Sequence, residues 1–327
     1  MSAPQDTNER QRSSPTLSMF LLASASSLLL SCATVPEAGP GAAAGEERVQ
    51  VVAHRGCWHG APENSLAAIA ACRKAGVDIV EIDVQRSADG VLLIMHDETV
   101  DRTTNGTGRI AELDWDEIAA LRLRKGVGGP DAALTEHAPP LLADALAAAS
   151  GTMLLNLDVK DARIFAEVIA LLHETNAGAN VIVKSALPPA SSAFAVFRSL
   201  GPVRFMPVVR QCDESAPLPA ELFCVGRGAD VSAAYASLEP FGYELIFHDE
   251  TFLADFVRSR PGKPTRVWVN VLVPGHAAGH VDALALADPD AHWGKLIDLG
   301  ATILQTDYPE RMTAYLRTRR VRPIDQP

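Results

Sequence analysis

From residue 49 onward, short runs of β-branched residues alternate with stretches rich in Ala and Leu, and this alternation constrains the fold more than any other feature of the chain. The pattern predicts parallel strands joined by crossover helices. We expect strands at 49–54, 77–83, 91–95, 152–159, 180–184, 203–209, 243–247, 266–271 and 301–305. We expect helices at 64–75, 114–122, 140–149, 161–175, 188–200, 229–239, 250–259, 290–299 and 309–320.

Nine expected strands are one more than an eightfold barrel requires. However, the polar segment 83–91 is able to join two neighbouring strands as a hairpin-like pair without a helix between them. The pattern therefore favours an α/β fold, a (β/α)8 TIM barrel, with an excursion formed by the long connection 97–139 after the second strand region. A doubly wound open sheet is the alternative, but the glycine-rich fingerprint that it would need after its first strand is absent.

The first 31 residues differ from the rest of the chain. Arg10 and Arg12 precede an apolar stretch, 17–30, that is short for a bilayer span and is followed by Ser31 and Cys32. This arrangement resembles the signal peptide of bacterial lipoproteins, in which the cysteine is lipid-modified and becomes the mature N-terminus. We therefore expect lipidation at Cys32 and a periplasmic, membrane-anchored location.

The expected organisation is a signal peptide at 1–31, a flexible tether at 32–48 and a barrel domain at 49–320. A signal peptide cut near Ala33, or a short anchor that is retained uncut, is the alternative. Beyond Cys32 the chain holds four cysteines, which an oxidising compartment would allow to pair in three ways. The sequence does not choose among these pairings or exclude free thiols; they are Cys57, Cys72, Cys212 and Cys224.

The net charge limits the classes of partner. Lys and Arg together number 29 and Asp and Glu 40, which gives a net charge of −11. This charge repels phosphate backbones and argues against a nucleic-acid partner, so any phosphate site must be local.

In barrels of this class the active site lies at the carboxyl ends of the strands. Polar clusters stand at six of the expected strand ends, where chance alone would place few of them. They are His54-Arg55, Glu81-Ile82-Asp83, His96-Asp97, Asp158-Val159-Lys160, Trp268-Val269-Asn270 and Thr306-Asp307.

Three of these residues are candidate metal ligands. Glu81 and Asp83 stand two apart in a strand and therefore project to the same face. Together with Asp158 they offer three hard oxygen donors, which suit Ca²⁺ or Mg²⁺. The alternative is a set of carboxylates neutralised by Arg55 and Lys160 without a metal ion.

Two histidines are the candidate acid and base. Imidazole titrates near neutral pH, so His54 and His96 are suited to take a proton from an attacking oxygen and to give one to a leaving group. Arg55 offers a planar fork of donors that matches a phosphate, and Lys160 offers a point charge. His276 and His280 are four apart but stand in a loop rich in Pro and Gly, and we do not expect them to bind metal.

These motifs, in this order, resemble the glycerophosphodiester phosphodiesterase family over roughly residues 49–318. The residues that carry the resemblance are His54-Arg55-Gly56, Pro62-Glu63-Asn64-Ser65, Glu81-Ile82-Asp83, His96-Asp97, Asp101-Arg102-Thr103-Thr104, Asn156-Leu157-Asp158-Val159-Lys160, Trp268-Val269-Asn270 and Thr306-Asp307-Tyr308-Pro309.

The resemblance implies a metal-dependent TIM barrel that hydrolyses a glycerophosphodiester, a small-molecule substrate, to glycerol 3-phosphate and an alcohol. One divalent cation, commonly Ca²⁺ or Mg²⁺, with Mn²⁺ as a further candidate, would be the cofactor. His54 and His96 would be catalytic, Glu81, Asp83 and Asp158 would bind the metal, and Arg55 and Lys160 would bind phosphate. From its place near a strand end, Trp268 is a candidate to stack against the glycerol or the alcohol; the alternative is an aromatic residue at the rim that packs under a loop. The family usually has Glu where this chain has Asp158, which is one methylene shorter.

Two other functions remain open from the sequence. The first is a lysophospholipase D or a sphingomyelinase D-like phosphodiesterase, which shares the barrel and the two histidines. The second is a catalytically inactive barrel that serves as a binding protein of the envelope. This second function predicts missing motif residues, whereas the central ones are all present.

Overall fold

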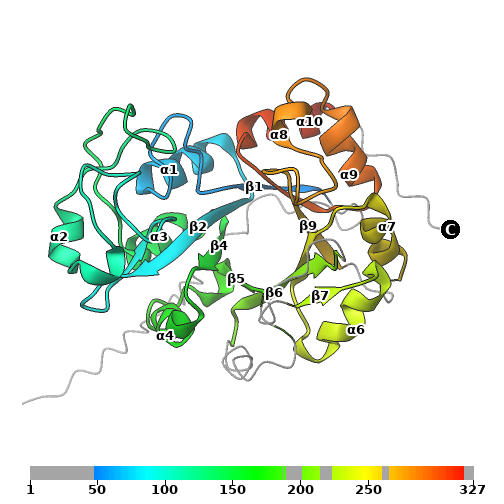
Figure 1. The fold of residues 1–327 in the computed structure, drawn as a ribbon, viewed down its shortest axis with the longest axis horizontal. Coiled ribbons are helices and arrows are strands. Elements are labelled where there is room, and N and C mark those ends of the chain that lie inside the picture. The colour runs from blue at the N-terminus through cyan, green and yellow to red at the C-terminus, as the bar shows by residue number, and fades with distance from the viewer. Residues whose placement is uncertain (1–47, 187, 189–200, 214–222, 260–264, 320–327) are drawn as a thin grey trace, which may run out of the picture. The chain divides into compact units, whose positions relative to one another are not determined.

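The computed structural model describes residues 48–186, 188, 201–213, 223–259 and 265–319. Within these residues, eight parallel strands form a closed barrel, because β1 pairs with both β2 and β10. The barrel confirms the predicted TIM fold and is shown in Figure 1. Its strands are β1 (Gln50–Ala53), β2 (Ile79–Arg86), β4 (Leu154–Val159), β5 (Val181–Ser185), β6 (Arg204–Gln211), β8 (Gly242–Ile246), β9 (Arg266–Asn270) and β10 (Ile303–Thr306).

The helices cover the outside of the barrel (Figure 1). The predicted helices are all found except 188–200, of which residues 189–200 lie outside the described residues. They are α1 (Leu66–Ala75), α2 (Trp115–Ala119), α3 (Leu142–Ala149), α4 (Phe165–Glu174), α6 (Val231–Tyr235), α7 (Glu250–Ser259), α9 (Lys295–Asp298), preceded by the π-helical turn η6 (Asp290–Gly294), and α10 (Pro309–Thr318). The short helix α8 (Asp282–Ala285) was not predicted from the sequence.

The start of α1 shows how local sequence sets an element next to the site. Ser65 is the N-cap, and its hydroxyl accepts a hydrogen bond from the backbone N–H of Ala68. The helix ends at Gly76, whose positive φ of 72° suits the left-handed conformation of a helix terminus. The Ser65 hydroxyl also donates a hydrogen bond to the backbone carbonyl of Pro62 at 2.7 Å. The loop between β1 and α1 is therefore held where it enters the helix.

The predicted excursion is present between β2 and α3. Strand β3 (Leu92–Ile94) pairs antiparallel with β2, as expected for a hairpin-like pair. The residues that follow pack around a small apolar core of their own, which α2 helps to cover. This core consists of Leu93, Met95, Val100, Ile110, Ile118 and Leu123.

Side chains on alternate positions of the strands fill the lower part of the barrel interior. Val52, Ile79, Ile182, Met206, Trp268 and Ile303 form this interior cluster and are fully buried. This interior cluster, which we call the apolar floor, lies directly beneath the polar residues nearer the carboxyl ends of the strands.

Two disulfides join the cysteines, Cys57 to Cys72 and Cys212 to Cys224. The first links the loop after β1 to α1, and the second links the end of β6 to the short strand β7 (Cys224–Val225), which the sequence did not predict. Among the described helices, none is both long and apolar enough to cross a membrane. The expected signal peptide, Cys32 and nearly all of the tether fall in 1–47, outside the described residues.

Candidate active site

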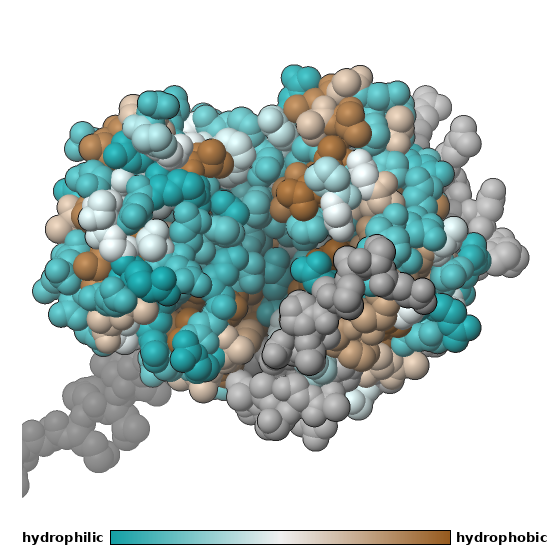
Figure 2. Space-filling model, viewed as in Figure 1, coloured by the Kyte–Doolittle hydropathy of each residue, from teal (hydrophilic) through white to brown (hydrophobic). Residues whose placement is uncertain are grey.

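A cavity of about 380 Å³ opens at the carboxyl ends of the barrel strands. Figure 2 shows hydrophilic residues gathered around the hollow in the middle of this face. Its polar lining comes from all eight barrel strands or the loops after them, which explains why residues far apart in sequence meet here. The polar residues are His54, Glu81, Asp83, Asp158, Lys160, Lys184, Ser185, Arg210, Glu244, Asn270, His276 and Gln305.

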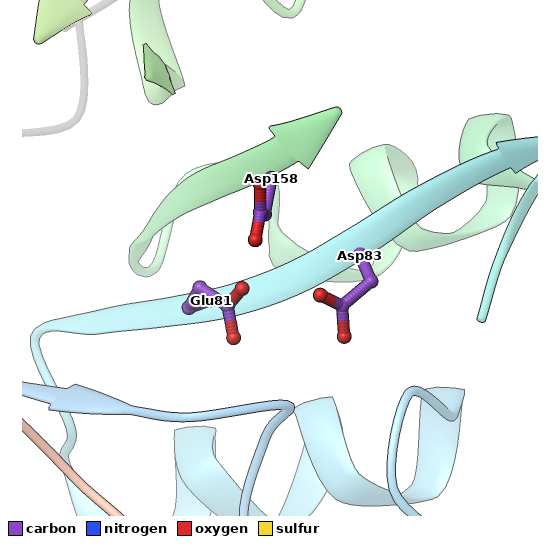
Figure 3. A group of neighbouring side chains, drawn as sticks. All are labelled: Glu81, Asp83 and Asp158. Atoms are coloured by element: carbon purple, nitrogen blue, oxygen red, sulfur yellow. The ribbon is translucent and has the colours of Figure 1, made fainter. Parts of the chain in front are cut away.

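The three predicted metal ligands meet on one side of the cavity. Glu81 and Asp83 project from β2 and Asp158 projects from β4, where it is the register partner of Asp83 (Figure 3). One carboxylate oxygen from each lies within 4.8 Å of the others. Burial and the neighbouring charge of Asp83 raise the pKa of Glu81 to about 7. Burial alone would also raise the pKa of Asp158, but the charges of Lys184 and Lys160 lower it to about 2.

Two cations contact this cluster, as the metal-free alternative anticipated. Lys160 Nζ lies 2.6 Å from Asp83 Oδ1 and 2.8 Å from Asp158 Oδ2, and Arg55 Nε lies 3.7 Å from Asp83 Oδ2. Among the described residues, by contrast, Glu81 forms no ion pair and accepts a single hydrogen bond, from the backbone Arg55 N at 2.9 Å. A buried carboxylate without a cation of its own, beside two further oxygen donors, fits a hard divalent cation.

His54 follows β1 and is held by a carboxylate. Its Nδ1 lies 2.8 Å from Asp307 Oδ1, so Nδ1 carries the proton that is donated to Asp307 and Nε2 is left for exchange with a ligand. Burial of the ring would lower its pKa, but the hydrogen bond to Asp307 and the charge of Glu81 outweigh burial and raise it.

Asp307 is itself held in position by a second carboxylate, that of Asp282. Asp282, the first residue of α8, accepts hydrogen bonds from the Asp307 backbone N–H at 2.7 Å, from Thr306 Oγ1 at 2.7 Å and from Trp293 Nε1 at 3.0 Å. Burial raises the pKa of Asp282 to about 6 despite these donors. The loop after β9 thus fixes the carboxylate that orients His54.

His96 follows β3 and has a comparable partner. Its Nδ1 lies 2.7 Å from Asp97 Oδ1, and Arg102 binds Asp97 through two nitrogens, at 2.7 and 2.9 Å. This double contact holds the pKa of Asp97 well below its usual range. His96 does not line the cavity described above, but it is close enough to Asp158 to lower the pKa of that carboxyl.

Arg102 also joins the two histidine-bearing loops. Its guanidinium contacts Glu63 at 2.7 and 3.1 Å, and Glu63 contacts Arg55 at 3.3 Å. Glu63 therefore supports the first loop through two arginines, rather than serving in the three-carboxylate group. Asn64, the next residue, exchanges two hydrogen bonds with Asp83, at 2.7 and 3.0 Å, and so fixes that ligand.

The prediction for Trp268 needs correction. The indole is fully buried in the interior cluster, and its Nε1 donates to Asn270 Oδ1 at 2.7 Å and Gln305 Oε1 at 3.1 Å. Trp268 therefore supports two residues that line the cavity and offers no ring face on which glycerol or an alcohol would stack. The error arose because Trp268 stands two residues before the strand end, at the level of the apolar floor.

Lys184 and Glu244 form a buried ion pair on the cavity wall that sequence reasoning missed. Their Nζ and Oε2 atoms lie 3.4 Å apart, and Asn270 Nδ2 donates to Glu244 Oε1 at 2.8 Å. Burial opposes the charge of Lys184, but Glu244 and Asp158 raise its pKa above the usual range. The sequence did contain a signal for this pair, because Lys184 in β5 and Glu244 in β8 are each the single charged residue of an otherwise mostly apolar strand.

The two histidines that were not expected to bind metal, His276 and His280, have different surroundings. His276 lines the cavity, whereas His280 contacts Glu250 at 3.0 Å and His292 at 3.1 Å. They do not join the three-carboxylate group, and the described residues show no other cluster of at least three such ligands.

Comparisons with known proteins agree with this arrangement. Residues 54–190 match the model of the Glycerophosphoryl diester phosphodiesterase family. That segment is related to this family. Residues 226–316 match a model described only as a domain of unknown function. The chain is 52% identical over 75 residues to Glycerophosphodiester phosphodiesterase 1 of Bos taurus, which is 23% of each chain. It is 34% identical over 140 residues to a Glycerophosphodiester phosphodiesterase of Caldanaerobacter subterraneus, covering 41% of this chain and 57% of that one.

Solved structures share the fold over most of the chain. A glycerophosphoryl diester phosphodiesterase of Parabacteroides distasonis has a TM-score of 0.62 at 20% identity, covering 86% of this chain and 91% of that one. An Oleispira antarctica phosphodiesterase in complex with the product sn-glycerol-3-phosphate has a TM-score of 0.58 at 24% identity, covering 82% and 97%. The aligned stretches span between about a quarter and three fifths of the curated relatives named above.

Proposed function

We propose that the protein is a metal-dependent glycerophosphodiester phosphodiesterase that releases glycerol 3-phosphate and an alcohol. One observation carries the proposal. Two histidines, each hydrogen-bonded through Nδ1 to its own carboxylate, act electrostatically on a group of three carboxylates, the buried Glu81 and Asp83 and the half-buried Asp158, at the carboxyl ends of a barrel. The match of residues 54–190 to the phosphodiesterase family supports it.

Glu81, Asp83 and Asp158 would hold one divalent cation, Ca²⁺, Mg²⁺ or Mn²⁺. When bound, such an ion acts as a Lewis acid that polarises a phosphoryl oxygen. Asn64 and the Arg55 backbone N–H hold Asp83 and Glu81 in place for this role. The shorter Asp158 contacts Lys160 at 2.8 Å, so its oxygen is shared between the lysine and the proposed ion site.

The chain's own groups then bind the phosphate and move the protons. Arg55 and Lys160 lie at the edge of the carboxylate group and offset negative charge on the phosphate oxygens. His54 and His96 take a proton from the attacking oxygen and give one to the leaving alcohol. In each ring the hydrogen bond from Nδ1 to a carboxylate keeps Nε2 as the exchanging nitrogen.

The location follows as a further part of the proposal. Residues 1–31 would be a lipoprotein-type signal peptide and Cys32 the lipidated residue, which would anchor the barrel to a membrane in the periplasm. Two disulfides among the four remaining cysteines support an oxidising compartment. Labelling of the expressed protein with a radioactive fatty acid, with Cys32→Ala as the control, tests the anchor; equal label in both proteins contradicts it.

The reaction is tested by incubating the purified protein with glycerophosphocholine and measuring glycerol 3-phosphate. We expect a chelator to stop release and one of Ca²⁺, Mg²⁺ or Mn²⁺ to restore it. Calorimetric titration with that ion should show one site, which Asp83→Asn removes and the exposed control Asp116→Asn, on α2, retains. Release that is indifferent to chelator would contradict the metal, and absence of release with every ion would contradict the activity.

A further inference from the structure

The cavity has a second polar wall, which the proposed reaction does not use. We call the β6–β9 wall the set formed by Arg210 on β6, Glu244 on β8, Asn270 on β9 and His276 in the loop after β9; all four line the same cavity as the carboxylate group. In the cyclic order of the barrel, β8 stands four strands from β2 in either direction. The wall therefore faces the carboxylate group across the cavity.

Glu244 already has an amide donor and a cation beside it on this wall. Asn270 donates to its Oε1 at 2.8 Å, and Lys184 Nζ lies 3.4 Å from its Oε2. The charge of Glu244 therefore offsets that of Lys184. It leaves no carboxylate on the wall for Arg210.

Arg210 is the cation without a partner. Among the described residues its side chain forms neither an ion pair nor a hydrogen bond, and its Nε is buried without an acceptor. The Nδ1 of His276 is likewise buried without a partner. The buried Nε–H of Arg210 is a donor without an acceptor, and so is His276 Nδ1 in the tautomer that carries the ring proton there. Such donors are costly, so an acceptor brought by a ligand is bound with an advantage.

The backbone holds both side chains in place. Arg210 pairs with Cys224 of β7 and with Ile246 of β8, and the disulfide from Cys212 to Cys224 fixes the end of β6. The backbone carbonyl of His276 accepts a hydrogen bond from the Phe247 N–H at 3.1 Å, which ties its loop to the end of β8. Donors held in this way need little reordering when a ligand binds.

The charge of the wall selects the ligand. Burial lowers the pKa of His276; Glu244 opposes the shift, whereas Arg210, Lys184 and His54 reinforce it, so the ring is neutral at neutral pH. Because Glu244 offsets the charge of Lys184, the guanidinium of Arg210 is the uncompensated charge that a ligand contacts on the β6–β9 wall. It attracts an anion and repels a quaternary ammonium.

We propose that Arg210, assisted by His276, forms a subsite for an anionic group on the alcohol portion of the diester, namely a carboxylate or a phosphate. The inference rests on the proposed function, which places the scissile phosphate at the opposite wall beside Lys160. The preferred substrates are glycerophosphodiesters whose alcohol carries an acid group, rather than those with choline.

Two probes that differ by one carboxylate test the subsite. Glycerophosphoserine is glycerophosphoethanolamine with a carboxylate added, and glycerol 3-phosphate release measures both. We expect the protein to favour the serine diester, and Arg210→Gln to reduce the ratio of the two kcat/KM values by about tenfold, as loss of a charge-assisted hydrogen bond does. Arg210→Lys should restore part of the ratio, and the exposed control Arg163→Gln should leave it unchanged.

The outcomes separate this inference from the proposed function. An equal loss on both probes would place Arg210 on the scissile phosphate and overturn the subsite, as would a ratio that Arg210→Gln does not change. If neither probe is hydrolysed, the proposed function fails, and calorimetric binding of the two probes still decides the subsite. Equal dissociation constants for the two would overturn it, and tighter binding of the serine diester that Arg210→Gln removes would support it.

Discussion

The two walls of the cavity differ in how their polar groups are paired. On the side of β1, β2 and β4, an unbroken series of contacts runs from His96 through Asp97, Arg102 and Glu63 to Arg55. On the β6–β9 wall, Arg210 Nε and His276 Nδ1 are buried with neither a hydrogen bond nor an ion pair among the described residues.

The difference follows from what each wall would have to do. Acid–base groups and metal ligands need fixed positions before the substrate arrives, and their partners supply this order. A recognition surface instead keeps donors for the ligand to satisfy. The paired wall lies within the segment that matches the phosphodiesterase family, and the open wall lies outside it.

Removing a histidine from the paired wall should have the largest effect. His54→Ala or His96→Ala should lower kcat by about 10³-fold, within the range for general acid–base groups. His173→Ala, at an exposed position on α4, is the matched control. Full activity in either variant would show that the paired wall does not carry the chemistry.

The stability of the two walls should also differ. Arg102→Gln leaves Asp97 and the buried Glu63 without their shared cation, so we expect the free energy of unfolding to fall by about 3 kcal/mol. Arg210→Gln breaks no ion pair and should lower it by about 0.5 kcal/mol or less. Urea unfolding of both variants measures the difference, and equal losses would show that the two walls do not differ in how their charges are paired.

Asp307 connects two parts of the barrel, because it follows β10 and orients His54, which follows β1. Asp307→Asn should lower kcat/KM about tenfold, a loss typical of removing a partner that orients a functional side chain. The hydrogen bond to Asp307 and its charge raise the pKa of His54, so their loss lowers that pKa. The limb of the pH profile set by His54 should move to lower pH: the acidic limb if His54 is the base, the alkaline limb if it is the acid. A profile with both limbs unmoved would show that Asp307 does not act through His54.

Most of the fold could be read from local patterns. The nine expected strands are all present, as are the hairpin-like pair formed by β2 and β3 and the excursion that follows β3. Strand β7 was missed because two residues, Cys224 and Val225, give no periodic signal. The cysteine pairing was open in sequence and is set by which segments the barrel brings together.

The candidate site was predictable where chemistry and strand ends coincide, as at Glu81, Asp83 and His54. It was not predictable where a residue acts through a distant one. Asp282 reaches His54 only through Asp307, and Glu63 reaches His96 through Arg102 and Asp97. No spacing in the chain encodes such contacts, since they cross the barrel's loops.

The barrel and the residue types at its strand ends could be inferred from the sequence, because strand periodicity and acid–base chemistry are local properties. Only the tertiary structure decided which of those side chains reach the cavity. The fold buries Trp268 within the interior cluster, brings Lys184 and Glu244 to the cavity wall, and leaves Arg210 without an anionic partner among the described residues. How deep a side chain lies in the barrel, and which side chains meet across it, depend on the register of the strands and on the closure of the sheet. Both are set by all the strands together, so no local pattern predicts them.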